Sequence, residues 1–62
     1  MHFQIYCHQD CKCSLKIVGD AAVREFDSIL AALEAARELS ESGESPLTVY
    51  STTGTVIFET MV

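Results

Sequence analysis

The stretch FQIYCHQDCKCSLKIV, residues 3–18, decides the start of the fold because it alternates twice between apolar and polar side chains. The alternation covers residues 3–7 and resumes at 12–18, which is the period-2 pattern of half-buried β-strands. The segment between them is typical of a turn. A loop of residues 9–11 predicts the facing pairs Cys7–Cys13, Ile5–Leu15 and Phe3–Ile17. A slip of one position would set apolar side chains opposite the lysines of the second strand, so we expect this register.

A single amphipathic helix is predicted over residues 28–42. Asp27 or Ser28 is suited to be its N-cap. Gly43 is suited to the C′ position, and Pro46 prevents the helix from continuing. The apolar side chains of this segment recur on one stripe at helical spacing: Ile29, Ala32, Leu33, Ala36 and Leu39. Because the helix is rich in alanine, it can approach a sheet closely.

Residues 47–62 indicate a second hairpin. The segment 51–54, STTG, suits a four-residue loop that ends in a left-handed glycine. That loop predicts the inward pairs Val49–Val56 and Leu47–Phe58.

The expected fold is therefore α+β in the order ββαββ, with a four-stranded antiparallel sheet of two hairpins packed on one helix. Residues 22–26 fit either a short extra strand or the approach to the helix. The whole chain, residues 1–62, is expected to form one small domain. Since one helix covers only one face of such a sheet, the other face stays open. We expect Tyr6, Tyr50 and Ile57 on that open face.

The chain resembles a group of small uncharacterised bacterial ββαββ domains of unknown function. The resemblance rests on the two-stranded start, on FDSILAALEAAREL at 26–39 and on LTVYSTTGTVIF at 47–58. The shared pattern is a Phe before the cap, an Ala-rich helix ending in Ala-Arg-Glu-Leu, and a hairpin closed by glycine. This resemblance implies the fold and a bacterial source. It assigns no functional residue, because the group has no agreed activity.

The charge balance disfavours two classes of partner. Nine acidic and four basic side chains give a net charge of −5, and the basic ones are scattered along the chain. Nucleic-acid binding needs clustered Lys and Arg, and an anionic membrane attracts the same clusters. No apolar run approaches the roughly 20 residues of a membrane span. The N-terminus has no pattern of a secretory signal, so we expect a cytoplasmic protein with reduced thiols.

Cys7, Cys11 and Cys13 form the densest group of reactive side chains. A zinc site needs four ligands and usually takes them from pairs such as C-x₂-C. Here the spacings are C-x₃-C and C-x-C, with no second pair downstream. Asp10 or a second subunit would have to supply the fourth ligand. The three cysteines are therefore weak candidates for metal ligands, and the prediction is that no metal is bound.

A Cys7–Cys13 disulfide across the hairpin is the redox alternative. Facing positions hold Cβ atoms about 4.5–5.5 Å apart, farther than the mean of about 3.8 Å in disulfides. The predicted order of elements also places no cation or helix N-terminus beside these thiols. We therefore expect Cys7 and Cys13 to be small core residues and Cys11 to be a turn residue that meets solvent, apart from the other two.

His8, Asp10 and Cys11 contain the parts of a base and a nucleophile. Such chemistry also needs a pocket and a stabiliser for the developing charge, for which a thin domain has little volume. His8 follows Cys7 on a strand, so its side chain should leave the opposite face. We expect no enzymatic activity, no catalytic residue and no cofactor.

The expected function is that of a non-catalytic protein-interaction module. Its interaction surface would be Tyr6, Tyr50 and Ile57 on the open sheet face. Its partner would be another protein or a second copy of the chain, in which case the protein is a homodimer. The alternative is a metal-binding or thiol-redox module built on the three cysteines.

Overall fold

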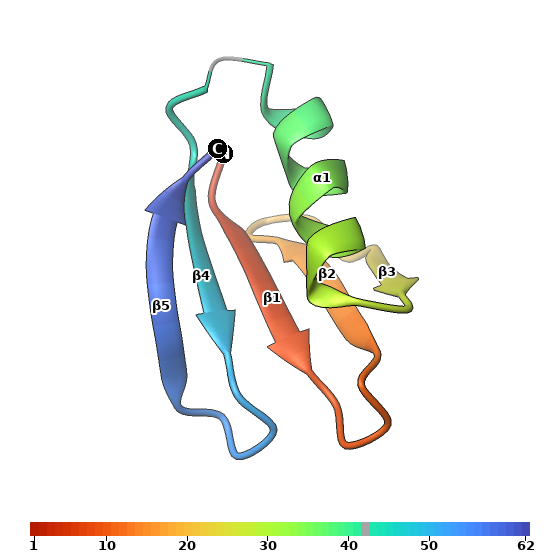
Figure 1. Ribbon diagram of the computed structural model, residues 1–62. Coiled ribbons are helices and arrows are strands. Elements are labelled where there is room, and N and C mark those ends of the chain that lie inside the picture. Colours follow the sequence, from red (N-terminus) through yellow and green to blue (C-terminus); the bar gives the residue numbers. More distant parts are fainter. Residues whose placement is uncertain (42) are drawn as a thin grey trace.

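The computed structural model describes residues 1–41 and 43–62 and has an α+β fold, as the sequence predicted (Figure 1). Its elements are strand β1 (Phe3–Cys7), strand β2 (Cys13–Ile17), strand β3 (Val23–Phe26), helix α1 (Ile29–Ser40), strand β4 (Pro46–Tyr50) and strand β5 (Val56–Met61). The described part of the chain therefore has five strands rather than four. The segment 22–26, which the sequence left open, contains the strand β3.

The strands form one mixed sheet in the order β3-β2-β1-β4-β5. The prediction of an all-antiparallel sheet is wrong at one place, because β1 and β4 are parallel. The extra strand explains this difference. β1, β2 and β3 form an antiparallel meander, so β3 runs in the direction of β1. Helix α1 then returns the chain across the sheet, and β4 enters beside β1 in the same direction, as a helical crossover connection allows.

The first hairpin has the predicted register. Phe3 faces Ile17, Ile5 faces Leu15 and Cys7 faces Cys13. The loop is residues 9–11, as expected.

The loop is closed by two backbone hydrogen bonds. The His8 amide donates to the Lys12 carbonyl at 2.8 Å, and the Cys11 amide donates to the His8 carbonyl at 3.1 Å. Cys11 has a φ of 68°, so the loop is a type I turn followed by a left-handed residue.

Helix α1 begins at the predicted cap. The Ser28 side chain accepts a hydrogen bond from the Ala31 amide at 3.1 Å. The helix ends at Ser40, and Glu41 is its C-cap with a φ of 60°. Gly43 is therefore not the first residue with positive φ after the helix. The predicted last residue, Ser42, lies outside the described residues.

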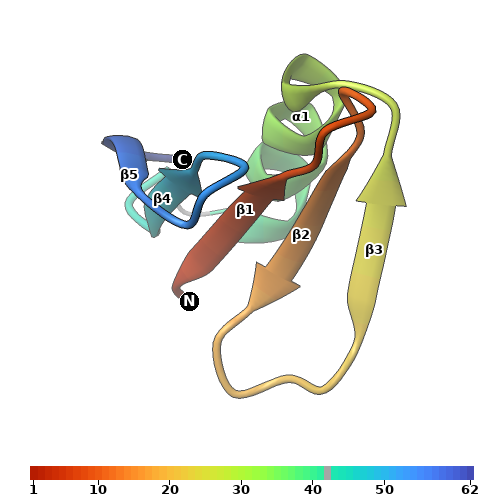
Figure 2. The ribbon, with the colours of Figure 1, turned by 90° about the horizontal axis from the view of Figure 1, so that it is seen from below.

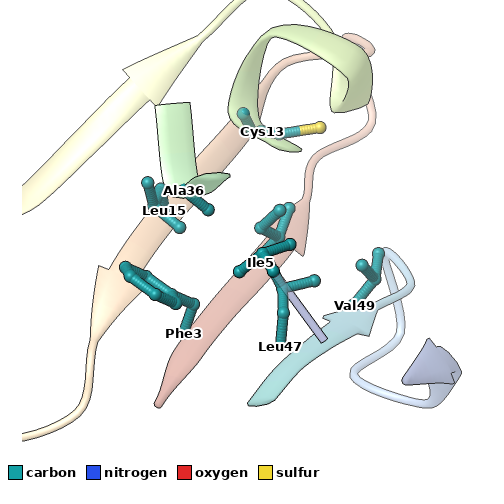
Figure 3. Packing of buried hydrophobic residues seen from close by; sticks show 9 residues of the cluster. Phe3, Ile5, Cys13, Leu15, Ala36, Leu47 and Val49 are labelled. Atoms are coloured by element: carbon teal, nitrogen blue, oxygen red, sulfur yellow. The ribbon is translucent and has the colours of Figure 1, made fainter. Parts of the chain in front are cut away.

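The core lies under α1 on one face of the sheet, and its buried strand residues come from β1, β2 and β4. The backbone of the helix lies nearest to β1, β2 and β3. Figure 2 shows the helix on one side of these strands, away from β5. Ala32 and Ala36 are fully buried on the sheet-facing side of α1. Figure 3 shows the side chains that fill this layer: Phe3, Ile5, Cys13, Leu15, Ala36, Leu47 and Val49. The stripe of small residues thus allows the helix to pack closely, as the sequence indicated.

The second hairpin forms, but its predicted register is wrong. Val49 faces Phe58 rather than Val56, and Leu47 faces Thr60 rather than Phe58. The first cause is the loop, which has three residues and not four.

The Ser51 amide donates to the Thr55 carbonyl at 2.7 Å, and the Gly54 amide donates to the Ser51 carbonyl at 3.0 Å. Gly54 has a φ of 87°, so this loop repeats the geometry of the first one. In both loops the third residue has positive φ.

The second cause is a β-bulge at Ile57, between the pairs of Val49 and Tyr50. Without the bulge, a three-residue loop would set Glu59 beside the buried Leu47. The extra residue shifts the register by one position, so Glu59 faces Thr48 on the open side of the sheet. The bulge therefore keeps a carboxylate out of the core.

Candidate functional site

The three cysteines line one pocket of about 530 Å³. Cys13 is buried, Cys7 is half-buried and Cys11 is exposed. Cys11 is an exposed turn residue, as expected, and it also lines the pocket of Cys7 and Cys13. Cys11 has the same left-handed backbone as Gly54 in the other loop, although a side chain makes that conformation less favourable.

Cys7 and Cys13 face each other on the helix side of the first hairpin, as the alternation predicted. The Cys13 thiol contacts the Cys7 sulfur, with the two Sγ atoms 3.7 Å apart. All three cysteines are free thiols in the structure.

The start of α1 also lines this pocket, through Asp27, Ser28 and Ile29. The expectation that no helix N-terminus lies beside the thiols is thus wrong. The reason is the strand β3, whose last residue Phe26 pairs with Cys13. The residues after Phe26 must therefore cross the end of β2, next to the cysteines. A firm assignment of β3 from the sequence would have revealed this neighbourhood.

Burial raises the pKa of the Cys13 thiol to about 11. The hydrogen bond to Cys7 and the charges that Cys7 and Cys11 would carry as thiolates act in the same direction. Cys13 therefore remains protonated at neutral pH. Because the thiolate is the reactive form of a cysteine, the resting Cys13 thiol is a poor nucleophile.

This pKa predicts that the protein loses stability in alkaline solution. An unfolded Cys13 ionises near pH 9, whereas the folded one keeps its proton up to about pH 11. Above pH 9 the unfolded state binds fewer protons, so the free energy of unfolding should fall between pH 9 and 11. We expect the fall that is due to Cys13 to be on the order of 2 kcal/mol. Urea unfolding of the wild type and of Cys13→Ala at pH 8, 9, 10 and 11 measures it. The wild type should lose more stability than the variant over this range. Equal losses would contradict the assignment to Cys13.

The structure does not bring His8, Asp10 and Cys11 together as a base and nucleophile. The Asp10 carboxylate accepts a hydrogen bond from the Lys12 amide at 3.2 Å and so belongs to the turn. The His8 Nε2 atom instead lies 2.6 Å from the Ser14 hydroxyl.

Ser14 in turn donates to Glu25 at 2.8 Å, which forms a chain of three polar side chains across β1, β2 and β3. We did not predict this chain from the sequence. The pairing of Ser14 with Glu25 would have indicated it once β3 was assigned.

Metal binding finds no support in the geometry. Among residues 1–41 and 43–62, no group of three or more Cys, His, Asp and Glu side chains is placed to hold one ion.

The expected interaction surface is divided between two places. The rings of Tyr6 and Tyr50 stack at 4.8 Å with an angle of 8° between their planes. Ile57 is not with them, because it is the bulged residue of β5 and lines the cysteine pocket. The three residues therefore do not form one patch.

The strand β5 is the most exposed element of the sheet. Every residue of Val56–Met61 is exposed, and four of the six are large and apolar: Val56, Ile57, Phe58 and Met61. Within the described chain, no strand lies beside its outer edge. The sequence predicted the strand, but its position at the edge follows from the mixed sheet.

Comparison with protein-family models, with curated proteins and with solved structures found no match to this chain. Helix α1, at twelve residues, is too short to cross a membrane, and the described residues contain no other segment of helix that could.

Proposed function

We propose that the protein is a non-catalytic interaction module that forms a homodimer by pairing β5 of one copy antiparallel with β5 of a second copy. The observation that supports this proposal is that every residue of an apolar strand at the edge of the sheet is exposed. An unpaired edge offers backbone N–H and C=O groups in a row and is a template for another strand.

The two edges of the sheet differ in a way that favours β5. The opposite edge, β3, has four residues, and two of them are the charged Arg24 and Glu25. A short and charged edge strand is a common protection against pairing. The strand β5 has six residues and one charge, Glu59. It lacks the shortness and the charges that protect β3, and its regular pairing with β4 runs over residues 58–61, beyond the bulge at Ile57.

The distribution of charge is compatible with a second copy as the partner when contact is made through residues 45–62. Twelve of the thirteen charged side chains lie in residues 1–44, and Glu59 is the only one in 45–62. Two copies with a net charge of −5 each repel one another in most orientations. Contact through the β4–β5 hairpin brings together the parts with least charge and keeps the acidic helices apart.

Helix coverage favours the same arrangement. The helix contacts β1, β2 and β3 but not β5, so the helix side of β5 is uncovered, whereas Leu47 and Val49 of β4 are fully buried (Figure 1). Phe58 pairs with the buried Val49 on that side and is 40% exposed. Antiparallel pairing about a twofold axis places both helices on the same side of the joined sheet. The two copies of Phe58 then lie in the space between the helices.

The test compares the same substitution at the two edges of the sheet. Val56 on β5 and Val23 on β3 are 47% and 53% exposed, so a lysine at either position costs the monomer little. Val56→Lys should weaken dimerisation at least about tenfold, because each copy of the dimer brings one unfavourable lysine to the β5–β5 contact. Val23→Lys should leave it unchanged. Sedimentation equilibrium across protein concentration gives the association constant.

We expect the wild type to change from a mass of 6.8 kDa toward twice that value as its concentration rises. A mass that stays at 6.8 kDa at every concentration would refute the dimer. Equal weakening by the two lysine variants would refute the assignment to β5.

The same features support a cytoplasmic location. The three cysteines are free, and their odd number prevents complete pairing within one chain.

The net charge of −5 argues against nucleic acid or an anionic membrane as the partner.

A further inference from the structure

We propose that Cys7 and Cys13 are a redox-active dithiol that closes to a cross-strand disulfide when it reacts with a low-molecular-weight disulfide such as oxidised glutathione. The proposal stands on the geometry of the cysteine pocket and does not depend on dimerisation.

The first support is the position of the two thiols in the hairpin. The backbone hydrogen bond from His8 to Lys12 belongs to the neighbouring pair. By alternation, Cys7 and Cys13 form a non-hydrogen-bonded pair, whose Cα atoms lie about 4.5 Å apart. This value falls at the short end of the range of about 4.4–6.8 Å in disulfides. The Sγ atoms are 3.7 Å apart, so side-chain rotation with a small backbone adjustment brings them into bonding distance.

The second support is the room beside Cys7. The pocket of about 530 Å³ is open to solvent, its walls are mainly apolar, and His8 and Asp27 are its titratable lining residues besides the cysteines. Ser28, Ser51 and Thr52 supply hydroxyl groups, and Ile29 and Ile57 supply apolar surface. A small peptide-like disulfide carries both kinds of group. The pocket can therefore receive such a molecule at the half-buried Cys7, whereas Cys13 has only 1% of its surface exposed.

The difference in burial assigns the two roles. Cys7, as a thiolate, attacks one sulfur of the small disulfide, forms a mixed disulfide and releases one small thiol. Cys13 then gives up its proton and attacks the Cys7 sulfur, which releases the second small thiol. One disulfide bond breaks and one forms. Two electrons pass from the cysteines to the small disulfide, and the two cysteine protons end on the two released thiols.

The raised pKa of Cys13 is consistent with the second role. Burial is the largest cause of that pKa and remains after the first step, whereas the smaller contribution of the Cys7 thiolate disappears once Cys7 is in a mixed disulfide. Cys13 therefore becomes easier to ionise after the first step than before it.

Cys11 lines the same pocket and is the competing thiol. Its exposure favours collision with a small disulfide in solution. The structure records a sulfur contact for Cys7 with Cys13, and that contact selects the pair that closes. We expect Cys11 to remain a free thiol in the oxidised protein.

The experiment treats the reduced protein with oxidised glutathione and identifies the product by mass spectrometry and by alkylation of free thiols. The mass of the wild type should decrease by that of two hydrogen atoms, with no glutathione attached. Only Cys11 should then be alkylated. The double variant Cys11→Gly, Cys13→Ala should retain one glutathione on Cys7, since no other thiol is left to displace it. Excess reduced glutathione should reopen the wild-type bond.

Cys11→Gly is the matched control. Glycine is suited to the positive φ of this position, as Gly54 shows in the equivalent loop, so the variant keeps the turn and removes the third thiol. It should close the Cys7–Cys13 bond as the wild type does. Loss of closure in Cys11→Gly, or a wild type that holds glutathione on Cys11 while Cys7 and Cys13 stay free, would overturn the proposal. Circular dichroism of each variant establishes that the chain is folded when it is treated.

Discussion

Replacing Phe3 with alanine should leave a large fraction of the protein unfolded in water. Phe3 is fully buried, between Ile17 on β2 and Leu47 on β4. Removal of a buried phenylalanine ring costs about 3–5 kcal/mol, because the apolar contacts are lost and a cavity remains. A domain of 62 residues has a total stability of only about 3–9 kcal/mol. The two quantities are similar, so we expect urea unfolding followed by circular dichroism to show a transition shifted close to zero denaturant.

The matched control is Phe58→Ala on the exposed strand β5. This phenylalanine is 40% exposed and lies outside the part of the sheet that α1 covers. Its replacement should lower the stability of the monomer by less than about 1 kcal/mol. Both variants need to be unfolded at a concentration where the wild type is monomeric, since dimerisation adds to the apparent stability. Equal losses for the two variants would show that the core is not where the structure places it.

The first hairpin could be predicted completely because its polar residues and its loop leave no alternative. The lysines of β2 alternate with Cys13, Leu15 and Ile17, so a slip of one residue would put charged side chains opposite the core residues of β1, and the three-residue loop fixes which of the remaining registers forms. The helix start was predictable for a similar reason. Ser28 is a strong capping residue that directly precedes the apolar stripe, and its side chain satisfies a free amide of the first turn.

The register of the second hairpin could not be predicted because apolar and polar residues do not alternate at the start of β5. Val56, Ile57 and Phe58 are three apolar residues in a row, so any of them can be assigned to the core side. The position of Glu59 decides the register, but only once the loop is known to have three residues. A bulge then becomes necessary, and no local signal of the bulge precedes that step.

The order of the strands in the sheet could not be predicted from the sequence, for a different reason. Alternation shows which side chains share a face of a strand, but it does not show which strands are neighbours. The position of β4 depends on whether β3 exists, because the third strand changes the direction in which the helix returns the chain. The four-residue segment Val23–Phe26 is too short to decide that question by its pattern.

The surroundings of the cysteines were also predicted only in part. The sequence predicted correctly that Cys7 and Cys13 face each other on the core side. It did not predict that the start of α1 would line their pocket. That position depends on β3, whose last residue Phe26 pairs with Cys13. One unassigned strand therefore accounts for the missed sheet order and for the missed site.

Replacing Ala36 with aspartate should destabilise the protein by several kcal/mol. Ala36 is fully buried where α1 meets the sheet, among apolar side chains that offer a carboxylate no hydrogen bond. Removing a charged group from water without a partner costs several kcal/mol, which is comparable to the whole stability of a domain of this size. Urea unfolding at pH 7 measures the loss. The deficit should shrink as the pH is lowered toward about 4, because burial favours the protonated and uncharged carboxyl.

The matched control for this variant is Ala31→Asp, which makes the same change in the same helix. Ala31 lies in the first turn of α1, is only half-buried and is not part of the core. A carboxylate in the first turn interacts favourably with the helix dipole, so we expect a change within about 1 kcal/mol. A large loss at Ala31 with a small loss at Ala36 would mean that the helix presents another face to the sheet. Such a result would remove the basis for an uncovered β5, because the face that α1 buries determines which strands it leaves exposed.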